Sequence, residues 1–154
     1  MRPQPGAVNP LLPGRLVGMT ARFNDAVRKL FDDPNPAVLA TVNPDGSPQT
    51  SVVWVGRDGD ELVVSSQAGR RKERNIRRDP RVSISVYDRD DPQKYAEVRG
   101  VATITEDIGR ELAVRLDEQY EGPGAGDEYL RLPPEVVRVV IRITPLRVTG
   151  YTAN

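Results

Sequence analysis

Two adjacent basic residues, Arg71 and Lys72, stand where a strand, a short loop and a basic helix are expected to follow one another. The strand before them ends in two hydroxyl side chains, Ser65 and Ser66. The first turn of a helix has unpaired N–H groups and the positive end of the helix dipole, so it attracts an anion. The basic pair would add full charges at that position. The spacing therefore predicts a phosphate-binding site at this junction.

The same residues also allow a simpler interpretation, a solvated basic helix, which is the usual explanation of a charge run. Three features favour a ligand. Cations are disfavoured at a helix N-terminus unless an anion is present, and Gly69 permits close approach of the backbone. Ser65 and Ser66 offer two hydroxyl groups just before the helix. The later arginines are interpreted mostly as surface charge; they are Arg74, Arg77, Arg78 and Arg81. Local physics alone leaves both interpretations open.

The sequence contains no histidine and no cysteine. A histidine-based triad, a cysteine nucleophile and a thiolate metal site are therefore excluded. Any chemistry must come from carboxylates, hydroxyls, lysine or arginine, or from a bound cofactor. We identify no catalytic residue and expect no metal.

Charge is balanced overall, with 22 basic and 22 acidic residues, but it is unevenly distributed. Residues 70–81 hold seven basic residues against two acidic ones, whereas residues 106–135 hold nine acidic residues against three arginines. A neutral chain argues against a dedicated nucleic-acid-binding protein, and the local basic patch favours a smaller anionic ligand. No apolar run is long enough for a membrane span or resembles a signal sequence. We expect a cytoplasmic protein with no nucleic-acid or membrane partner.

The expected organisation is a flexible N-terminal arm at 1–18, rich in proline and glycine, and one cofactor-binding domain at 19–154. The domain should open with a helix capped by Thr20. Its apolar face has helical spacing and consists of Phe23, Ala26, Val27, Leu30 and Phe31.

About six strands are predicted, joined mainly by tight turns. A hairpin of Ala37–Val42 and Pro48–Val55 leads into Glu61–Ser66, so the first three strands should form a meander. The remaining strands are expected at 81–87, 95–105 with a bulge at Gly100, and 136–143 continuing to 147–151 past a kink at Pro145. A helix is expected at Asp107–Tyr120 with Ile108 on its apolar face, and a helical turn at 128–132. This order predicts a small antiparallel barrel with short helices.

Aromatic residues offer a second set of candidates. Trp54 is the only tryptophan, and it suits either the core or the wall of an aromatic ligand pocket. Tyr87 and Tyr95 have the same two interpretations. Glu97 and Arg99 share one side of a strand, and a surface ion pair explains them.

Taken together, these motifs resemble the pyridoxamine 5′-phosphate oxidase-like flavoproteins. The resemblance consists of Gly69-Arg70-Arg71-Lys72, Asn75 and Asp79-Pro80-Arg81-Val82-Ser83, placed after a hairpin with Asp45-Gly46-x-Pro48. The stretch Tyr95-x-Glu97-Val98-Arg99-Gly100 is similar to the branch that uses the deazaflavin coenzyme F420. The resemblance covers roughly residues 20–151. It implies a mainly β (α+β) fold, an antiparallel split β-barrel with short helices. It also implies a homodimer with cofactor sites at the subunit interface.

The resemblance also implies which residues bind the cofactor. Arg71 and Lys72 match the phosphate-binding pair, Ser65 and Ser66 match the strand end beside the ribityl chain, and one further strand matches the segment that contacts the ring. That segment consists of Ser51, Val52, Val53, Trp54 and Val55; Asn75 and Tyr95 belong to the matching motifs. The flavin-mononucleotide oxidases carry a basic residue at the positions of Ser51 and Gly56, which this sequence lacks, and their histidine-dependent substrate site must be incomplete here.

The resemblance thus implies an F420-dependent oxidoreductase that transfers a hydride between the deazaflavin and a small unsaturated organic substrate. A deazaflavin carries its hydride itself, which suits a chain without histidine or cysteine. The alternatives are an FMN-binding oxidoreductase of the same family, an F420 carrier without turnover and, from the basic patch, a nucleic-acid-binding barrel.

Overall fold

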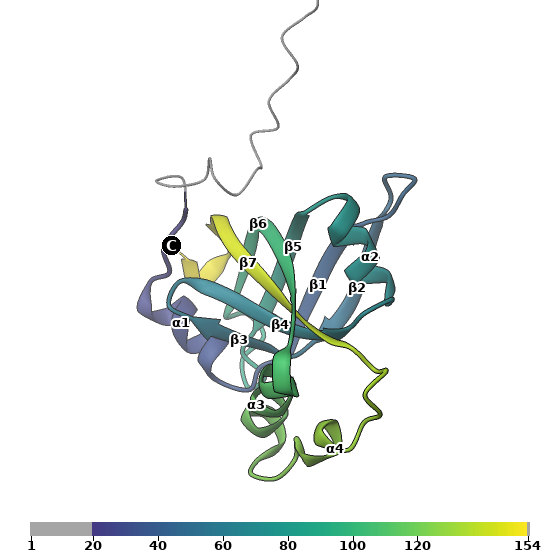
Figure 1. The fold of residues 1–154 in the computed structure, drawn as a ribbon. Helices are drawn as coiled ribbons and strands as arrows, with labels where there is room; N and C mark the ends of the chain where they lie inside the picture. The colour runs from purple at the N-terminus through teal and green to yellow at the C-terminus, as the bar shows by residue number, and fades with distance from the viewer. Residues whose placement is uncertain (1–19, 154) are drawn as a thin grey trace, which may run out of the picture.

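The computed structural model describes residues 20–153, and the arm predicted at 1–18 lies outside them. The described chain is an antiparallel seven-stranded sheet, curled into a half-barrel, with a few short helices (Figure 1). The predicted split-barrel fold is confirmed. The strands are β1 (Ala37–Val42), β2 (Pro48–Val53), β3 (Val55–Asp58), β4 (Glu61–Gln67), β5 (Arg81–Tyr87), β6 (Tyr95–Glu106) and β7 (Arg138–Thr149). The helices are α1 (Asp25–Asp32), α2 (Arg71–Arg78), α3 (Glu111–Glu121) and α4 (Asp127–Leu130).

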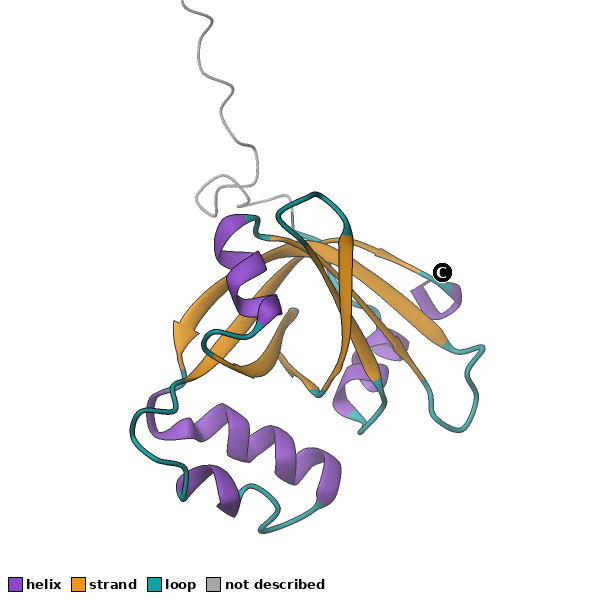
Figure 2. Ribbon diagram, turned by 90° about the vertical axis from the view of Figure 1, so that its right-hand side faces the viewer, coloured by secondary structure: helices purple, strands orange, loops and turns teal. Residues whose placement is uncertain are grey.

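The strand order explains the curl. The order is β2-β1-β5-β6-β7-β4-β3, so β2 and β3 lie at opposite ends of the sheet. Only Trp54 separates these two strands in the sequence. The sheet must therefore bend until its two edges come together at that residue, and Figure 2 shows the resulting cup.

The chain passes from one edge of the sheet to the other between β2 and β3, and this β2–β3 crossing corrects two predictions. The β1–β2 hairpin is confirmed, but the single strand Pro48–Val55 is divided at Trp54. The three-strand meander is wrong, because β4 pairs with β3 and β7 and not with the first hairpin. Turn signals describe each hairpin locally, whereas the pairing of β4 with β7 depends on residues far apart in the sequence.

The interior of the half-barrel is apolar. Leu39, Ile84 and Ile141 project into it from β1, β5 and β7 and have no exposed surface. Full burial of one such side chain stabilises the fold by about 1.5–3 kcal/mol. Helix α1 covers this core with Val27 and Phe31.

Helix α1 begins later than predicted. It starts at Asp25, and its cap is Asn24, whose Oδ1 accepts the Val27 N–H at 2.8 Å. Thr20 is therefore not the cap. Phe23 precedes the helix, yet it is buried with its ring centroid 5.6 Å from that of Phe31. The apolar spacing identified the buried side correctly but not the first helical residue.

Strand β6 has a bulge at Gly100 where it pairs with β7, as predicted. The register shifts between Arg99 and Gly100, and a Cβ on Gly100 would lie 2.1 Å from the Thr144 carbonyl oxygen. Only glycine tolerates that approach. Pro145 pairs with Gly100 inside one continuous strand, so the two closing segments form a single β7 that begins at Arg138.

The predicted helix at Asp107 consists of two pieces. A short 3₁₀ turn at Ile108–Arg110 is followed by α3. The last two residues of this turn, Gly109 and Arg110, have positive φ. Ile108 is 79% exposed, so its expected place on the apolar face is wrong. The Asp107 carboxylate accepts the Leu112 and Ala113 N–H groups at 3.0 and 2.9 Å and fixes the start of α3. Helices α3 and α4 lie side by side at one end of the sheet (Figure 1).

Across residues 20–153, no helix combines the length and the apolar character that a membrane crossing needs.

Candidate functional site

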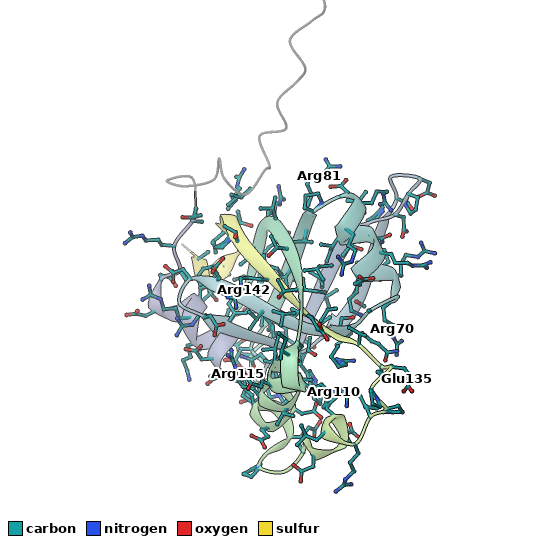
Figure 3. All side chains as sticks on the ribbon, viewed as in Figure 1. Arg70, Arg81, Arg110, Arg115, Glu135 and Arg142 are labelled. Atoms are coloured by element: carbon teal, nitrogen blue, oxygen red, sulfur yellow. The ribbon has the colours of Figure 1, made fainter. Side chains whose placement is uncertain are left out.

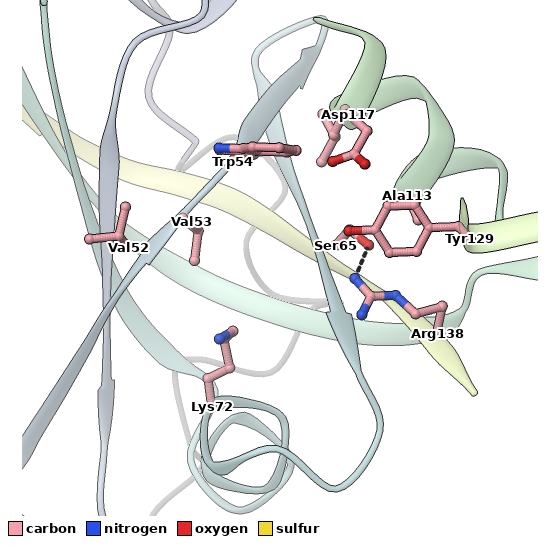
Figure 4. Close-up of a pocket in the computed structure, with 10 residues that line it drawn as sticks. Val52, Val53, Trp54, Ser65, Lys72, Ala113, Asp117, Tyr129 and Arg138 are labelled. Atoms are coloured by element: carbon pink, nitrogen blue, oxygen red, sulfur yellow. Dashed lines mark hydrogen bonds between the residues drawn. The ribbon is translucent and has the colours of Figure 1, made fainter. Parts of the chain in front are cut away.

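A cavity of about 250 Å³ lies where the first turn of α2, the β2–β3 crossing, the strands β4 and β7 and the helices α3 and α4 meet (Figure 4). Its walls combine cationic, aromatic and carboxyl groups. The lining residues are Val52, Val53, Trp54, Ser65, Lys72, Ala113, Leu116, Asp117, Tyr129 and Arg138.

Two cations mark one side of the cavity. Lys72 comes from the first turn of α2, and Arg138 comes from the start of β7. Burial lowers the pKa of Lys72, and the charges of Arg70 and Arg138 lower it further. Burial likewise lowers the pKa of Arg138. Both shifts mean that the positive charges are poorly solvated here, and a bound anion would stabilise them.

Arg138 is held firmly but retains an unused donor. Its Nη2 donates to Ser65 Oγ at 2.8 Å, and its guanidinium lies 4.9 Å from the centroid of the Tyr129 ring. Its Nε is buried and finds no acceptor among the described residues. Buried donors are normally paired, so this group indicates a ligand with an acceptor oxygen.

The start of α2 is shaped by Glu73. No side chain caps the helix from Arg70, and the loop reaches it through Gly69 at φ 90°. The Glu73 carboxylate accepts the Gly69 N–H at 3.0 Å and pairs with Arg77. Burial alone would raise the Glu73 pKa, but these partners outweigh it and the pKa is lowered. Glu73 is thus paired with Arg77 and the loop, and Lys72 is the cation of α2 that lines the cavity.

The aromatic wall is rigid. Trp54 stacks on Tyr120 with ring centroids 5.1 Å apart and an interplanar angle of 10°. Tyr120 Oη donates to the Asn35 carbonyl at 2.8 Å and accepts the Val55 N–H at 3.2 Å. Burial raises the Tyr120 pKa, so the phenol remains protonated. Trp54 packs against the cluster under α3 and also lines the cavity, so its role as the wall of a ligand pocket stays a prediction.

The structure brings together five of the predicted site residues: Val52, Val53, Trp54, Ser65 and Lys72. Four others are placed elsewhere. Arg71 is exposed and does not line the cavity. Ser66 is buried on the opposite face of β4 from Ser65. Tyr95 lies at the far end of β6, beside Tyr151.

Asn75 is the fourth. It is fully buried, and its amide donates to Thr41 Oγ1 and Asn43 Oδ1, both at 3.0 Å, which ties α2 to the first hairpin. The remaining two residues are adjacent in the sequence to Val52–Trp54 but do not line the cavity themselves. Ser51 Oγ is buried without a partner among the described residues, and Val55 is buried with its N–H bonded to Tyr120.

The other charges of α2, and Arg81 at the start of β5, do not line the cavity. Arg78 donates to the Val42 carbonyl and to Asn75, and Arg81 pairs with Asp79 at 2.7 Å. Figure 3 shows Arg70 near the cavity end of α2 and Arg81 near its other end. The predicted ion pair of Glu97 with Arg99 is also present.

Sequence reasoning missed five lining residues: the apolar Ala113 and Leu116 and the polar Asp117, Tyr129 and Arg138. Asp117 falls on the buried stripe of α3 with Ala113 and Leu116, and a carboxylate on such a stripe was a usable signal. Arg138 interrupts an apolar run at the start of β7 in the same way. Tyr129 gave no signal. Within the described part of the chain, no group of three or more acidic side chains gathers as metal ligands would.

The curled half-barrel of seven antiparallel strands with a few short helices is consistent with the split barrel of the pyridoxamine 5′-phosphate oxidase-like proteins. The family described as pyridoxamine 5′-phosphate oxidase matches residues 23–151, and the chain belongs to that family.

Two curated relatives are named pyridoxine/pyridoxamine 5′-phosphate oxidase. The one from Rubrobacter xylanophilus is 39% identical over 66 residues, which is 42% of this chain and 30% of the relative. The one from Rhodopseudomonas palustris is 33% identical over 86 residues, which is 54% of this chain and 40% of the relative. The matches therefore span less than half the length of these relatives.

Solved structures match over more of the chain. A structure named F420 reductase is 32% identical, with 82% of this chain and 98% of that chain covered and a TM-score of 0.68. A conserved hypothetical protein from Mycobacterium tuberculosis is 27% identical, with 84% of each chain covered and a TM-score of 0.64.

Proposed function

We propose that this protein is an F420-dependent oxidoreductase that transfers a hydride between the deazaflavin coenzyme and a small unsaturated organic substrate. The observation that carries the proposal is the similarity to the F420 reductase, 32% identical over nearly the whole of that structure. The matches to the two curated pyridoxine/pyridoxamine 5′-phosphate oxidases cover only 30% and 40% of the length of those relatives.

The cavity residues fit a phosphate-bearing ring cofactor. Lys72, Arg138 and Ser65 would hold the phosphate, since both cations are poorly solvated and Arg138 Nε lacks an acceptor. The Trp54 indole offers a flat surface to a ring, and Ser51 Oγ offers an unused polar group on the same segment. When bound, the deazaflavin supplies the hydride, so the chain itself needs only to bind, orient and shield the reactants.

We also propose that the protein is a homodimer with this cavity at the subunit interface. Val52 lines the cavity, yet it is 74% exposed, which is unusual for a large apolar side chain at a binding site and suits a covering second subunit. Light scattering at micromolar concentration should give the dimer mass, and a monomer would contradict this part of the proposal.

The main alternative is an FMN-binding oxidoreductase, which the names of the curated relatives favour. Purified protein separates the two proposals: a yellow protein with a flavin spectrum supports FMN, whereas colourless protein that quenches added F420 fluorescence supports F420. Turnover is then tested by following the oxidation of reduced F420 with cyclohex-2-en-1-one and with menadione. F420 binding without oxidation by either probe would indicate a carrier and contradict the reductase proposal.

A further inference from the structure

Asp117 is a buried carboxyl group that the proposed phosphate site does not use. It comes from α3, is only 4% exposed, and lines the cavity beside Trp54 (Figure 4). Among residues 20–153 it has no hydrogen-bond or ion-pair partner, whereas the buried Asp107 on the same segment bonds two backbone N–H groups. Burying a carboxyl group without a partner is costly, so its presence in a cavity indicates a role toward a ligand.

The groups around Asp117 come from four elements. Glu121 lies on α3, Glu128 and Tyr129 on α4, Arg138 on β7, and Lys72 faces the cavity from α2. Burial raises the pKa of Asp117, and the negative charges of Glu128 and Glu121 raise it further, while Arg138 opposes them. The raised pKa means that Asp117 keeps its proton to a higher pH than an ordinary aspartate does, and the protonated acid is the form that can donate.

We propose that Asp117 is the proton donor to the substrate that is reduced in this cavity. This inference rests on the proposed function. Reduction of a conjugated carbonyl needs a hydride at the β carbon and a proton on the resulting enolate. The electron pair and the new C–H bond come with the hydride of the reduced coenzyme, as the carbon–carbon π bond breaks. Asp117 gives its carboxyl proton to the enolate and takes another from solvent, while the second hydrogen of the reduced coenzyme leaves as a proton to solvent. Overall, reduced coenzyme and enone become oxidised coenzyme and saturated ketone.

Tyr129 is the competing donor, because its phenol also lines the cavity. Burial and the charge of Asp117 raise its pKa above the ordinary value of 10.0, which makes it a weak acid near neutral pH. A general acid works best when its pKa lies near the working pH. The pKa of Asp117 is shifted upward from 3.8, toward neutral pH, whereas the pKa of Tyr129 is shifted upward from 10.0, away from neutral pH.

The first test needs no substrate and compares urea midpoints of the wild type, Asp117→Asn and Glu118→Gln between pH 4 and pH 8. Glu118 is exposed on the same helix, so its variant reports the loss of one negative charge from α3 alone. Because the folded pKa of Asp117 is raised above 3.8, the wild type loses stability relative to Asp117→Asn as the pH rises toward the folded pKa. We expect the difference between the urea midpoints of Asp117→Asn and the wild type to widen as the pH rises. A difference that does not change with pH would overturn the inference.

The second test follows single-turnover oxidation of reduced F420 by cyclohex-2-en-1-one. Asp117→Asn should slow this step about a hundredfold, as loss of a general acid does, and should lose the fall in rate at high pH. Its dissociation constant for F420 should stay within about twofold of the wild type, and Glu118→Gln should keep the wild-type rate.

Three results would contradict the inference or its basis. If Asp117→Asn keeps the wild-type rate, Asp117 is not the proton donor, and the proposed function is unaffected. A larger loss in Tyr129→Phe than in Asp117→Asn assigns the donation to the phenol. A wild type that binds F420 but oxidises none of it with enone or quinone removes the proposed function, and with it the role of Asp117.

Discussion

The two faces of the sheet differ in what they bury. The inner face forms one large apolar core that α1 covers, and Leu62 and Val64 of β4 belong to it. The outer face carries a small cluster in which Val63 of the same strand packs against Leu112 and Leu116 of α3. One strand thus supplies both regions by alternation. The inner region buries almost only apolar groups, whereas the outer one leaves charged groups around a cavity. Stability should therefore depend on the first region and ligand binding on the second.

The largest expected effect is in the inner core. Ile141→Ala removes a fully buried side chain from the middle of β7 and should lower the free energy of unfolding by about 2–5 kcal/mol. Ile108→Ala is the control, since Ile108 is 79% exposed, and it should change stability by less than about 0.5 kcal/mol. Urea denaturation followed by tryptophan fluorescence measures both. Equal losses would mean that the inner face does not dominate stability.

The next effect separates binding from folding. Lys72→Ala should weaken F420 binding by about 1.5–3 kcal/mol, ten- to a hundredfold, because it removes a charge-assisted contact in the cavity. Arg74→Ala removes the same charge from an exposed position of α2 and should have a much smaller effect. Arg78 is a poorer control, since it bonds to the first hairpin.

Fluorescence titration of F420, with urea midpoints measured alongside, checks the pair. Equal losses of affinity would indicate diffuse attraction by the whole basic patch. Unchanged affinity in both variants would place the phosphate site elsewhere.

A substitution of Asn75 tests whether this residue serves stability or cofactor binding. The family resemblance places it in the cofactor site, but its amide is buried between α2 and the first hairpin. Asn75→Ala should therefore lower the free energy of unfolding by about 1–3 kcal/mol, because it leaves buried partners unpaired. F420 affinity measured on the folded fraction should remain close to that of the wild type. A selective loss of affinity without destabilisation would return Asn75 to the binding site.

The smallest effect is a pH dependence at the start of α2. The pKa of Glu73 is lowered below 4.5 by Arg77 and the Gly69 N–H, against the opposing effect of burial. Its contribution is fully present above pH 4.5 and is lost as the pH falls through the folded pKa. The urea midpoint of the wild type should exceed that of Glu73→Gln at pH 7 by a margin worth under about 1 kcal/mol, since Arg77 is largely exposed. The margin should shrink on acidification, and a margin that is independent of pH would contradict this assignment.

The sequence by itself determined the features that neighbouring residues encode. The turn at Asn43–Gly46 predicted the first hairpin, glycine chemistry predicted the bulge at Gly100, and charge spacing placed Lys72 in the first turn of a helix. Each depends on dihedral preferences or periodicity over a few residues, which is the range that local physics controls.

The tertiary structure decided which of these residues meet. Strands β4 and β7 pair with Ser65 opposite Val140, which requires the chain to cross the barrel at Trp54. The same pairing brings the Arg138 guanidinium within hydrogen-bond distance of Ser65. The same closure places Asp117 of α3 in the cavity with Lys72, and it leaves Asn75 and Tyr95 outside it. Strand pairing between distant segments is governed by the burial of a shared core, and no local pattern specifies it. The sequence therefore indicated Arg71 and Lys72 as a candidate phosphate-binding pair, but only the folded sheet decided that Lys72, and not Arg71, lines a cavity with Arg138 and Asp117.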